Sequence, residues 1–187
     1  MRVFLAITPP DAIKASLLSA IQRLTPIAAN VTWCTRERLH MTMAFLGDTA
    51  SAILPHITTA VERVCATHAP FTCQAYGFGF FGIKRNPTSL WAGINLDTNL
   101  ETLNDELWQA LKTFGYENAE ISFRPHITLG RCHSAPRNRA VVDAMAEDSE
   151  IDFGQWIVTH VSILESRPTP RGPIYRTIAN VPLQPPA

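Results

Sequence analysis

The sequence predicts an α+β fold with antiparallel sheets. Strand-like and helix-like segments alternate along the chain, and some strand-like segments follow one another directly, which argues against a doubly wound parallel sheet. A His-x-Thr sequence set in an apolar strand occurs twice, close to half the chain length apart, and indicates an internal duplication. These patterns together predict two similar halves, each with a sheet and flanking helices.

Composition supports a packed protein with a neutral surface. The chain has 187 residues, of which 46% are hydrophobic and 17% charged, so residues 1–187 are expected to form one domain with a sizeable core. Lys and Arg together number 16, as do Asp and Glu, which gives a formal net charge of zero. The long-range field that would hold a nucleic-acid duplex is therefore absent, and any contact with RNA or DNA is expected to be short and local.

Cysteine usage and the N-terminus bear on the cellular compartment. The chain has no Cys-x-x-Cys pair, and its cysteines are expected to be free thiols in a reducing compartment: Cys34, Cys65, Cys73 and Cys132. The first apolar run, Val3–Ile7, stops at Pro9 and is too short for a secretion signal or a membrane span. We therefore expect a cytoplasmic protein that does not enter membranes.

The first half of the chain predicts two strands and two helices. The first strand covers Arg2–Ile7, and Pro9-Pro10-Asp11 opens a helix whose first turn gains an acid beside its positive dipole end. The second strand covers His40–Leu46 and ends at Gly47. The apolar stripes identify both helices, the first by Ile13, Leu17, Leu18, Ile21 and Leu24, and the second by Ile53, Ile57, Val61 and Val64.

The remainder predicts further strands and two more helices. The aromatic and glycine-rich segment Phe71–Leu96 is expected to form two strands joined through residues 82–87. A third helix has its apolar residues at Leu100, Leu103, Leu107, Leu111 and Phe114 and ends at Gly115. A strand over His126–Gly130 and, after Pro136, a short helix with Val141, Val142 and Met145 follow. The last two strands are expected near Ile157–Leu164 and Ile174–Val181.

The two His-x-Thr strands are the strongest functional signal. Side chains alternate between the faces of a strand, so His40 and Thr42 project together, as do His126 and Thr128. If the two halves pack around a pseudo-two-fold axis, two imidazoles and two hydroxyls converge on one cleft. Structural histidines have no reason to recur in matched contexts, and the repetition therefore favours a catalytic site.

Two facing imidazoles around an anion-binding centre suit displacement at phosphorus. One histidine can take a proton from water while the other gives a proton to a leaving oxygen, and threonine hydroxyls can donate to phosphate oxygens. A strained cyclic phosphodiester fits this arrangement. No metal and no cofactor are expected.

The sequence resembles the 2H phosphoesterases, and among them the RNA 2′,3′-cyclic phosphodiesterase (LigT-like, 2′-5′ RNA ligase) family. The similarity covers nearly the whole chain and includes the twin His-x-Thr motifs, the start 1–7, the loop 87–93 and the tail 165–175. It implies a bilobal α+β fold, with two pseudo-symmetric lobes around a central cleft. It also implies metal-free hydrolysis of RNA 2′,3′-cyclic phosphate ends to 2′-phosphomonoesters by a monomer.

The resemblance also implies roles for individual residues. His40 would protonate the departing 3′-oxygen, His126 would activate water, and Thr42 and Thr128 would bind the phosphate. The sequence alone does not assign acid and base, and the two roles exchange in the reverse ligation.

Secondary candidates are weighed against structural explanations. Arg131 matches a family position and could neutralise phosphate, yet strict alternation places it off the His126 face. Phe45 could stack on a base, but the same alternation places it with the core residues. Tyr175 and Trp33 are further contacts, with core or rim packing as the alternative. Four cations could line an RNA path, with solvated loop charges as the more common explanation: Arg36, Arg38, Lys84 and Arg85. The histidines without a partner motif are expected to be structural or exposed: His56, His68, His133 and His160.

Other functions stay open at this level. The substrate could be a small cyclic nucleotide or an ADP-ribose cyclic phosphate rather than an RNA end. A non-catalytic RNA-end binding module would keep the cleft, but it would be expected to lose one of the two histidines. A metal-dependent hydrolase would use His40 and His126 with Cys132 or His133.

Overall fold

The computed structural model describes residues 1–118, 122–133, 138–170 and 172–184. The helices are α1 (Asp11–Leu24), α2 (Leu54–Cys65), α3 (Thr98–Lys112) and α4 (Arg139–Glu147), with the short 3-10 helix η1 (Arg36–Arg38). The strands are β1 (Arg2–Ile7), β2 (Val31–Trp33), β3 (Met41–Asp48), β4 (Phe71–Ile83), β5 (Asn86–Ile94), β6 (His126–Cys132), β7 (Asp152–Val158), β8 (His160–Arg167) and β9 (Ile174–Pro182).

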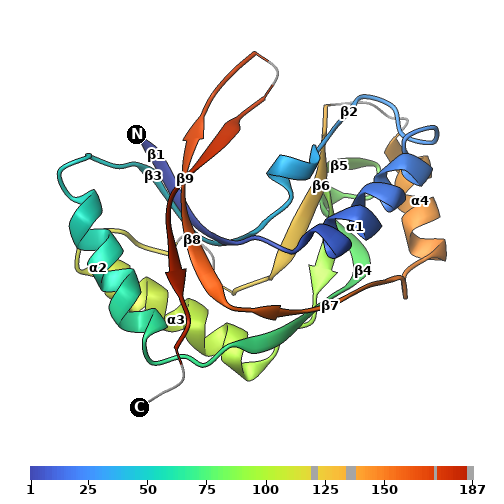
Figure 1. The fold of residues 1–187 in the computed structure, drawn as a ribbon. Coiled ribbons are helices and arrows are strands. Elements are labelled where there is room, and N and C mark those ends of the chain that lie inside the picture. The colour runs from blue at the N-terminus through green and yellow to red at the C-terminus, as the bar shows by residue number, and fades with distance from the viewer. Residues whose placement is uncertain (119–121, 134–137, 171, 185–187) are drawn as a thin grey trace.

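The strands form one antiparallel network of two halves that meet at β3 and β6. The order is β7-β4-β5-β6-β3-β1-β8-β9, and β2 pairs with β6. The junction is narrow, because β3 and β6 share the single register pair Met41–Ile127. We call the part with β1, β3, β8 and β9 the His40 lobe, and the part with β2, β4, β5, β6 and β7 the His126 lobe. Figure 1 shows α2 and α3 against the first lobe and α1 and α4 against the second.

The chain passes repeatedly between the lobes. It leaves β1 in the His40 lobe for α1 and β2 in the other lobe, and it returns for β3 and α2. The β4–β5 hairpin belongs to the His126 lobe, α3 packs on β3, and β6 to β7 lie in the His126 lobe again. The chain ends with β8 and β9 in the His40 lobe. Both lobes are thus assembled from segments far apart in the sequence.

Apolar periodicity explains the helices. In α1 the predicted residues Ile13, Leu17, Ile21 and Leu24 are buried, whereas Leu18 is half-buried and Ala20 completes the buried face. Helix α3 begins after Asp97, whose carboxylate accepts a hydrogen bond from the backbone N–H of Leu100 at 2.9 Å and so satisfies a free donor of the first turn. None of the described helices is long and apolar enough to span a membrane.

Two expectations about the strands need correction. The strand expected over Ile157–Leu164 is two strands, which end and begin on either side of Thr159 and belong to different lobes. Its apolar run continues across the break without Gly or Pro, so nothing in the pattern marks the crossover. Strand β2 and helix η1 were not predicted, because three-residue elements are too short to show a period. Pro136 lies outside the described residues, whereas the helix expected after it is present as α4.

Candidate active site

The two His-x-Thr motifs meet where the lobes join. Met41 pairs with Ile127 in antiparallel register, and continuing that register places His40 across from Thr128 and Thr42 across from His126. Met41 and Ile127 are fully buried, so the neighbouring histidines and threonines take the opposite face. The convergence that the duplication predicts is therefore present in the register.

Each imidazole is held by a backbone carbonyl two residues earlier. His40 Nδ1 lies 2.7 Å from the Arg38 oxygen, and His126 Nδ1 lies 2.7 Å from the Arg124 oxygen. A carbonyl oxygen only accepts hydrogen bonds, so Nδ1 carries the hydrogen in both rings. In the neutral imidazole the Nε2 atom then keeps its lone pair, ready to accept a proton. Both motifs thus present the same nitrogen for chemistry.

His40 is enclosed by aromatic rings. Its ring centroid lies 5.0 Å from that of Phe4 and 5.1 Å from that of Tyr175, and its Nε2 lies 3.1 Å from Thr42 Oγ1. The pKa of His40 is lowered from 6.5 to about 4, mainly by burial and to a smaller extent by the nearby charges of His126 and Lys14, while the hydrogen bond to the Arg38 carbonyl opposes the shift. His40 is therefore neutral at pH 7, and Thr42 donates to Nε2.

His126 has a different aromatic neighbourhood. Its ring lies 5.0 Å from Phe81 in an edge-on arrangement and 5.8 Å from Trp91. Trp91 lies flat over the backbone of Gly79, where a Cβ atom would overlap the six-membered ring of the indole. A glycine at position 79 therefore lets Trp91 lie beneath His126.

A β-bulge follows the motif in each of the two strands. Ala6 pairs with Thr42 and Leu5 pairs with Ala44, which leaves Met43 as the extra residue of β3. In β6 the extra residue is Leu129, because Trp91 pairs with Thr128 while Leu90 pairs with Gly130. Each bulge shifts the alternation by one position, so the fifth residue after each histidine returns to the histidine's face.

The bulges decide the positions of two candidates. Phe45 is 53% exposed rather than in the core, with the Arg2 guanidinium 5.6 Å above its ring. Arg131 is exposed on the cleft side, although strict alternation would turn it away. The buried Asn104 of α3 donates a hydrogen bond of 2.7 Å to the Met43 carbonyl, so the bulge in β3 is supported from the core.

A cavity of about 140 Å³ lies in front of the motifs. Its lining comes from both lobes and includes six of the seven predicted site residues: His40, Thr42, Phe45, Thr128, Arg131 and Tyr175. The remaining lining residues are Phe4, Cys34, Arg38 and Ser166. His126 is not among the lining residues, and its connection to the cavity is the register beside Thr42 and its charge interaction with His40.

Tyr175 is half-buried and reaches the cavity. Its ring meets those of Phe4 and His40 edge-on. Burial raises the pKa of the Tyr175 phenol, and the nearby Arg131 and Arg38 charges oppose that rise. The phenol therefore stays protonated at neutral pH and can donate a hydrogen bond.

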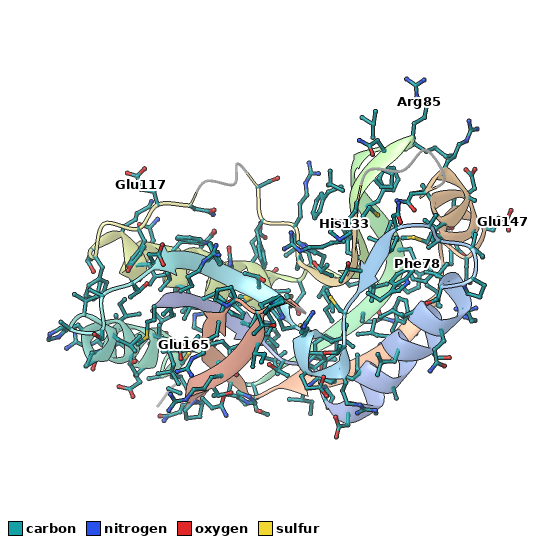
Figure 2. The ribbon with its side chains drawn as sticks, turned by 90° about the horizontal axis from the view of Figure 1, so that it is seen from above. Phe78, Arg85, Glu117, His133, Glu147 and Glu165 are labelled. Atoms are coloured by element: carbon teal, nitrogen blue, oxygen red, sulfur yellow. The ribbon has the colours of Figure 1, made fainter. Side chains whose placement is uncertain are left out.

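The other candidate cations take different positions. Arg38 lines the cavity, whereas Arg36 pairs with Asp11 at 2.8 Å and Lys84 pairs with Asp143 at 2.7 Å. Arg85 stands at the tip of the β4–β5 hairpin and points away from the molecule (Figure 2).

Sequence reasoning named Arg38 as a possible RNA-path cation but missed that its segment holds His40 in place. Its carbonyl holds His40 and its side chain lines the cavity, together with Cys34. The only signal was position, because Arg38 lies two residues before His40, just as Arg124 lies two residues before His126. Ser166 and Phe4 enter the cavity from β8 and β1, and no local pattern marks them.

The histidines without a partner motif have local hydrogen bonds or are exposed. His68 Nε2 lies 3.0 Å from Glu106, and His160 Nδ1 lies 3.1 Å from Thr159. His56 is exposed on α2. His133 Nε2 lies 2.8 Å from Thr32 Oγ1, on the wall of a second cavity that Trp33 also lines.

Two further classes of site can be compared with the geometry. The four cysteines are unpaired thiols, as predicted. Across the described ranges, no group of three His, Cys, Asp or Glu side chains could hold a metal ion.

The run 77–82 has the Gly-x-Gly-x-x-Gly spacing of dinucleotide-binding loops, but it lies inside strand β4 rather than before a helix. Its spacing therefore does not create the phosphate cradle of those loops.

Known proteins resemble this chain in sequence and in fold. Residues 9–169 match the 2′-5′ RNA ligase superfamily. An "RNA 2′,3′-cyclic phosphodiesterase" of Thermotoga maritima is 30% identical over 95% of this chain and 93% of its own. The crystal structure of the protein TT0787 of Thermus thermophilus superposes with a TM-score of 0.85 at 25% identity, covering 99% of both chains.

A more distant structure shares the fold. E. coli LigT complexed with 3′-AMP has a TM-score of 0.75 at 22% identity, covering 97% of this chain and 96% of the other. The architecture is accordingly the bilobal α+β fold that the duplication predicts. The extent of the sequence match establishes that the chain belongs to the 2′-5′ RNA ligase superfamily.

Proposed function

We propose that the protein hydrolyses RNA ends that carry a 2′,3′-cyclic phosphate to 2′-phosphomonoesters. The observation that carries the proposal is the pair of imidazoles, each with Nδ1–H fixed on a carbonyl and Nε2 left for proton transfer, beside a cavity with Thr42, Thr128 and Arg131 on its wall. The name of the Thermotoga maritima relative supports the same activity.

The reaction needs one proton removed and one proton supplied. A water oxygen attacks phosphorus while one histidine takes the water's proton, the P–O3′ bond breaks, and the other histidine protonates the departing 3′-oxygen. Thr42 and Thr128 donate to the nonbridging oxygens, and Arg131 balances their charge. The Thr42 hydroxyl turns from His40 Nε2 to the phosphate when the substrate binds. Phe45 stacks on a base of the RNA, as its exposed ring allows.

The resemblance to the family makes His40 the acid, and the electrostatics of the cavity set a condition for this role. His40 is neutral in the ligand-free protein, because burial lowers its pKa to about 4. A bound cyclic phosphate places a negative charge beside the ring, which favours the imidazolium and raises the pKa. Substrate binding therefore favours the protonated form of His40, which the acid must have. With the 5′-hydroxyl of a second RNA in place of water, the same groups form a 2′-5′ linkage.

The activity is tested with purified protein and a panel of cyclic phosphates in the presence of EDTA. The panel contains RNA 2′,3′-cyclic ends, cyclic mononucleotides and ADP-ribose 1″,2″-cyclic phosphate. We expect turnover of RNA ends to 2′-phosphates, unchanged by EDTA. A 3′-phosphate product would contradict the assignment of the leaving oxygen, and loss of turnover with EDTA would contradict a reaction by the protein's own groups.

The assignment of acid and base needs a separate substrate. A cyclic phosphorothiolate with sulfur in the 3′-bridging position has a leaving group that departs without protonation. On this substrate we expect His40→Ala to regain most of its lost turnover, whereas His126→Ala stays impaired. The opposite pattern would make His126 the acid.

A further inference from the structure

A second cavity of about 580 Å³ lies directly beside the first one. It falls in the size range of about 300–1,000 Å³ that is typical of ligand pockets, whereas the first cavity, at about 140 Å³, has room for the phosphate end of a substrate. Its walls are β2, the end of β6, η1 and the β8–β9 connection, and its lining is Thr32, Trp33, Cys34, Arg38, Arg131, His133, Thr169, Pro170, Gly172, Pro173 and Tyr175.

The two cavities adjoin. They share the side chains of Cys34, Arg38, Arg131 and Tyr175 in their linings, so two arginines stand where one cavity meets the other. Gly172 makes this boundary possible. Its φ is +97°, and a Cβ atom there would lie 2.9 Å from Arg38 Cζ, so the β8–β9 connection packs directly against the guanidinium. The boundary is therefore formed where the β8–β9 connection meets η1.

The lining of the second cavity suits a nucleotide. Two arginines and no acidic side chain appear among its described lining residues, which favours an anion. Trp33 and Tyr175 add aromatic rings, and the Thr32–His133 pair, 2.8 Å apart, adds polar groups that a base can meet. In Figure 2, seen from above, His133 lies between the side of the molecule with Glu117 and Glu165 and the far side with Glu147.

The structure of an RNA end determines how the strand would be oriented across the two cavities. In a ribose with a 2′,3′-cyclic phosphate, the base leaves from C1′ and the 5′ chain leaves from C4′, on opposite flanks of the C2′–C3′ bond. Phe45 of β3 offers a stacking surface within the first cavity, and Arg131 of β6 leads into the second. With the terminal base on Phe45, the next phosphodiester passes Arg38 and Arg131.

We propose that the second cavity binds the penultimate nucleotide of the RNA together with the phosphodiester that joins it to the terminal one. This inference rests on the proposed function and deepens it, because it requires the protein to recognise the last two nucleotides of the RNA end and not the terminal one alone. The protein is thus expected to hydrolyse the cyclic ends of RNA strands with a higher kcat/KM than small cyclic nucleotides.

The test compares adenosine 2′,3′-cyclic phosphate with the adenosine dinucleotide that carries the same cyclic end. We expect kcat/KM to be about tenfold or more higher for the dinucleotide, as one stacked base and one phosphate contact provide. His133→Glu places a negative charge in the second cavity and is expected to abolish most of this advantage, while turnover of the mononucleotide stays within about twofold. His56→Glu, the same change on exposed α2, serves as the matched control.

Two outcomes overturn the proposal. Equal kcat/KM for the mononucleotide and the dinucleotide in the wild-type protein would show that the second cavity does not bind the penultimate nucleotide. An equal loss for both substrates in His133→Glu would place the terminal nucleoside in the cavity instead. Either result would leave the proposed hydrolysis intact, because turnover of the mononucleotide reports it separately.

Binding provides a readout that does not depend on turnover. Calorimetric titration with the 2′-phosphate of the dinucleotide and of adenosine is expected to give a Kd about tenfold or more lower for the dinucleotide. His133→Glu should remove that difference and His56→Glu should keep it. Equal Kd values in the wild-type protein would contradict the proposal even if the protein hydrolysed neither cyclic substrate.

Discussion

The two central strands, β3 and β6, share a backbone plan and differ in the side chains it presents. Both fix a histidine on the carbonyl two residues earlier, both place a threonine beside it, and both carry a bulge immediately afterwards. At the fifth position after the histidine, however, β3 has Phe45 and β6 has Arg131. Duplication thus supplies a symmetric frame, and single side chains give its two ends different tasks.

The surroundings of the two histidines follow the same rule. Phe4 and Tyr175 enclose His40, whose pKa falls to about 4, whereas Phe81 and Trp91 flank His126. These aromatic residues come from β1, β9, β4 and β5, so the environment is set by neighbouring strands and not by the motif.

The largest effect is expected when the histidine that both strands share is replaced. His40→Ala and His126→Ala should each lower kcat by at least about 10²-fold, since general acid and base catalysis contribute this much. The double variant should be little worse than the single ones, because the two groups act in one step. Steady-state kinetics on an RNA 2′,3′-cyclic end measures this, with His56→Ala as the control and circular dichroism to confirm folding. Near-normal turnover in either single variant would refute the mechanism.

The next largest effect is expected at the charged residue that distinguishes β6 from β3, Arg131. Arg131→Leu should reduce kcat/KM about tenfold to a hundredfold, because it removes a charged donor to phosphate. The exposed Arg85 at the hairpin tip gives a matched control, and Arg85→Leu should leave kcat/KM unchanged. If both variants lost activity equally, Arg131 would have no specific place at the phosphate.

A smaller effect is expected at the equivalent position in β3. Phe45→Leu should raise KM about fivefold to tenfold with kcat nearly unchanged, because stacking on a base is lost while the phosphate contacts remain. A substrate without a base at the ring, such as glycerol 1,2-cyclic phosphate, should not distinguish the variant from the wild type. A fall in kcat on both substrates would indicate that Phe45 positions β3 instead.

A further effect, on stability rather than on turnover, follows from the low pKa of His40. In the unfolded chain this histidine gains its proton near pH 6.5, whereas in the folded protein it does so only near pH 4, so the unfolded state binds more protons between these values. The free energy of unfolding should therefore fall as the pH drops from 6.5 to 4, and His40 should add no slope above 6.5. Urea titrations at several pH values give the free energy of unfolding as a function of pH. Between pH 4 and 6.5 this free energy should change less with pH in His40→Gln than in the wild type, and as in the wild type in His56→Gln. An identical slope in His40→Gln would contradict the depressed pKa.

The sequence predicts most of the fold because its signals are local and repeated. The apolar stripes locate the helices, and the paired His-x-Thr strands indicate both the duplication and the chemistry. The crossover at Thr159 and the short elements β2 and η1 leave no periodic trace. The second cavity has Thr32, Trp33 and Arg38 of those unpredicted elements in its lining.

The candidate site was predictable only as far as strict alternation holds. Met43 and Leu129 are ordinary apolar strand residues, and nothing near them in sequence marks a bulge. The bulge in β3 is supported by Asn104, a polar residue on the buried face of a distant helix. The side-chain directions of Phe45 and Arg131 therefore depend on tertiary contacts that one strand's sequence does not contain.

The repeated passage of the chain between the lobes has a consequence for biosynthesis. The sheet of the His40 lobe has the order β3-β1-β8-β9, so it joins two strands that are synthesised early, β1 and β3, with two that are synthesised more than 100 residues later, β8 and β9. His40, Thr42, His126 and Thr128 are all synthesised before β8, whereas Tyr175 belongs to β9. A nascent or truncated chain therefore holds both motifs and Phe4 but not Tyr175, and the aromatic enclosure of His40 is complete only once β9 has been made.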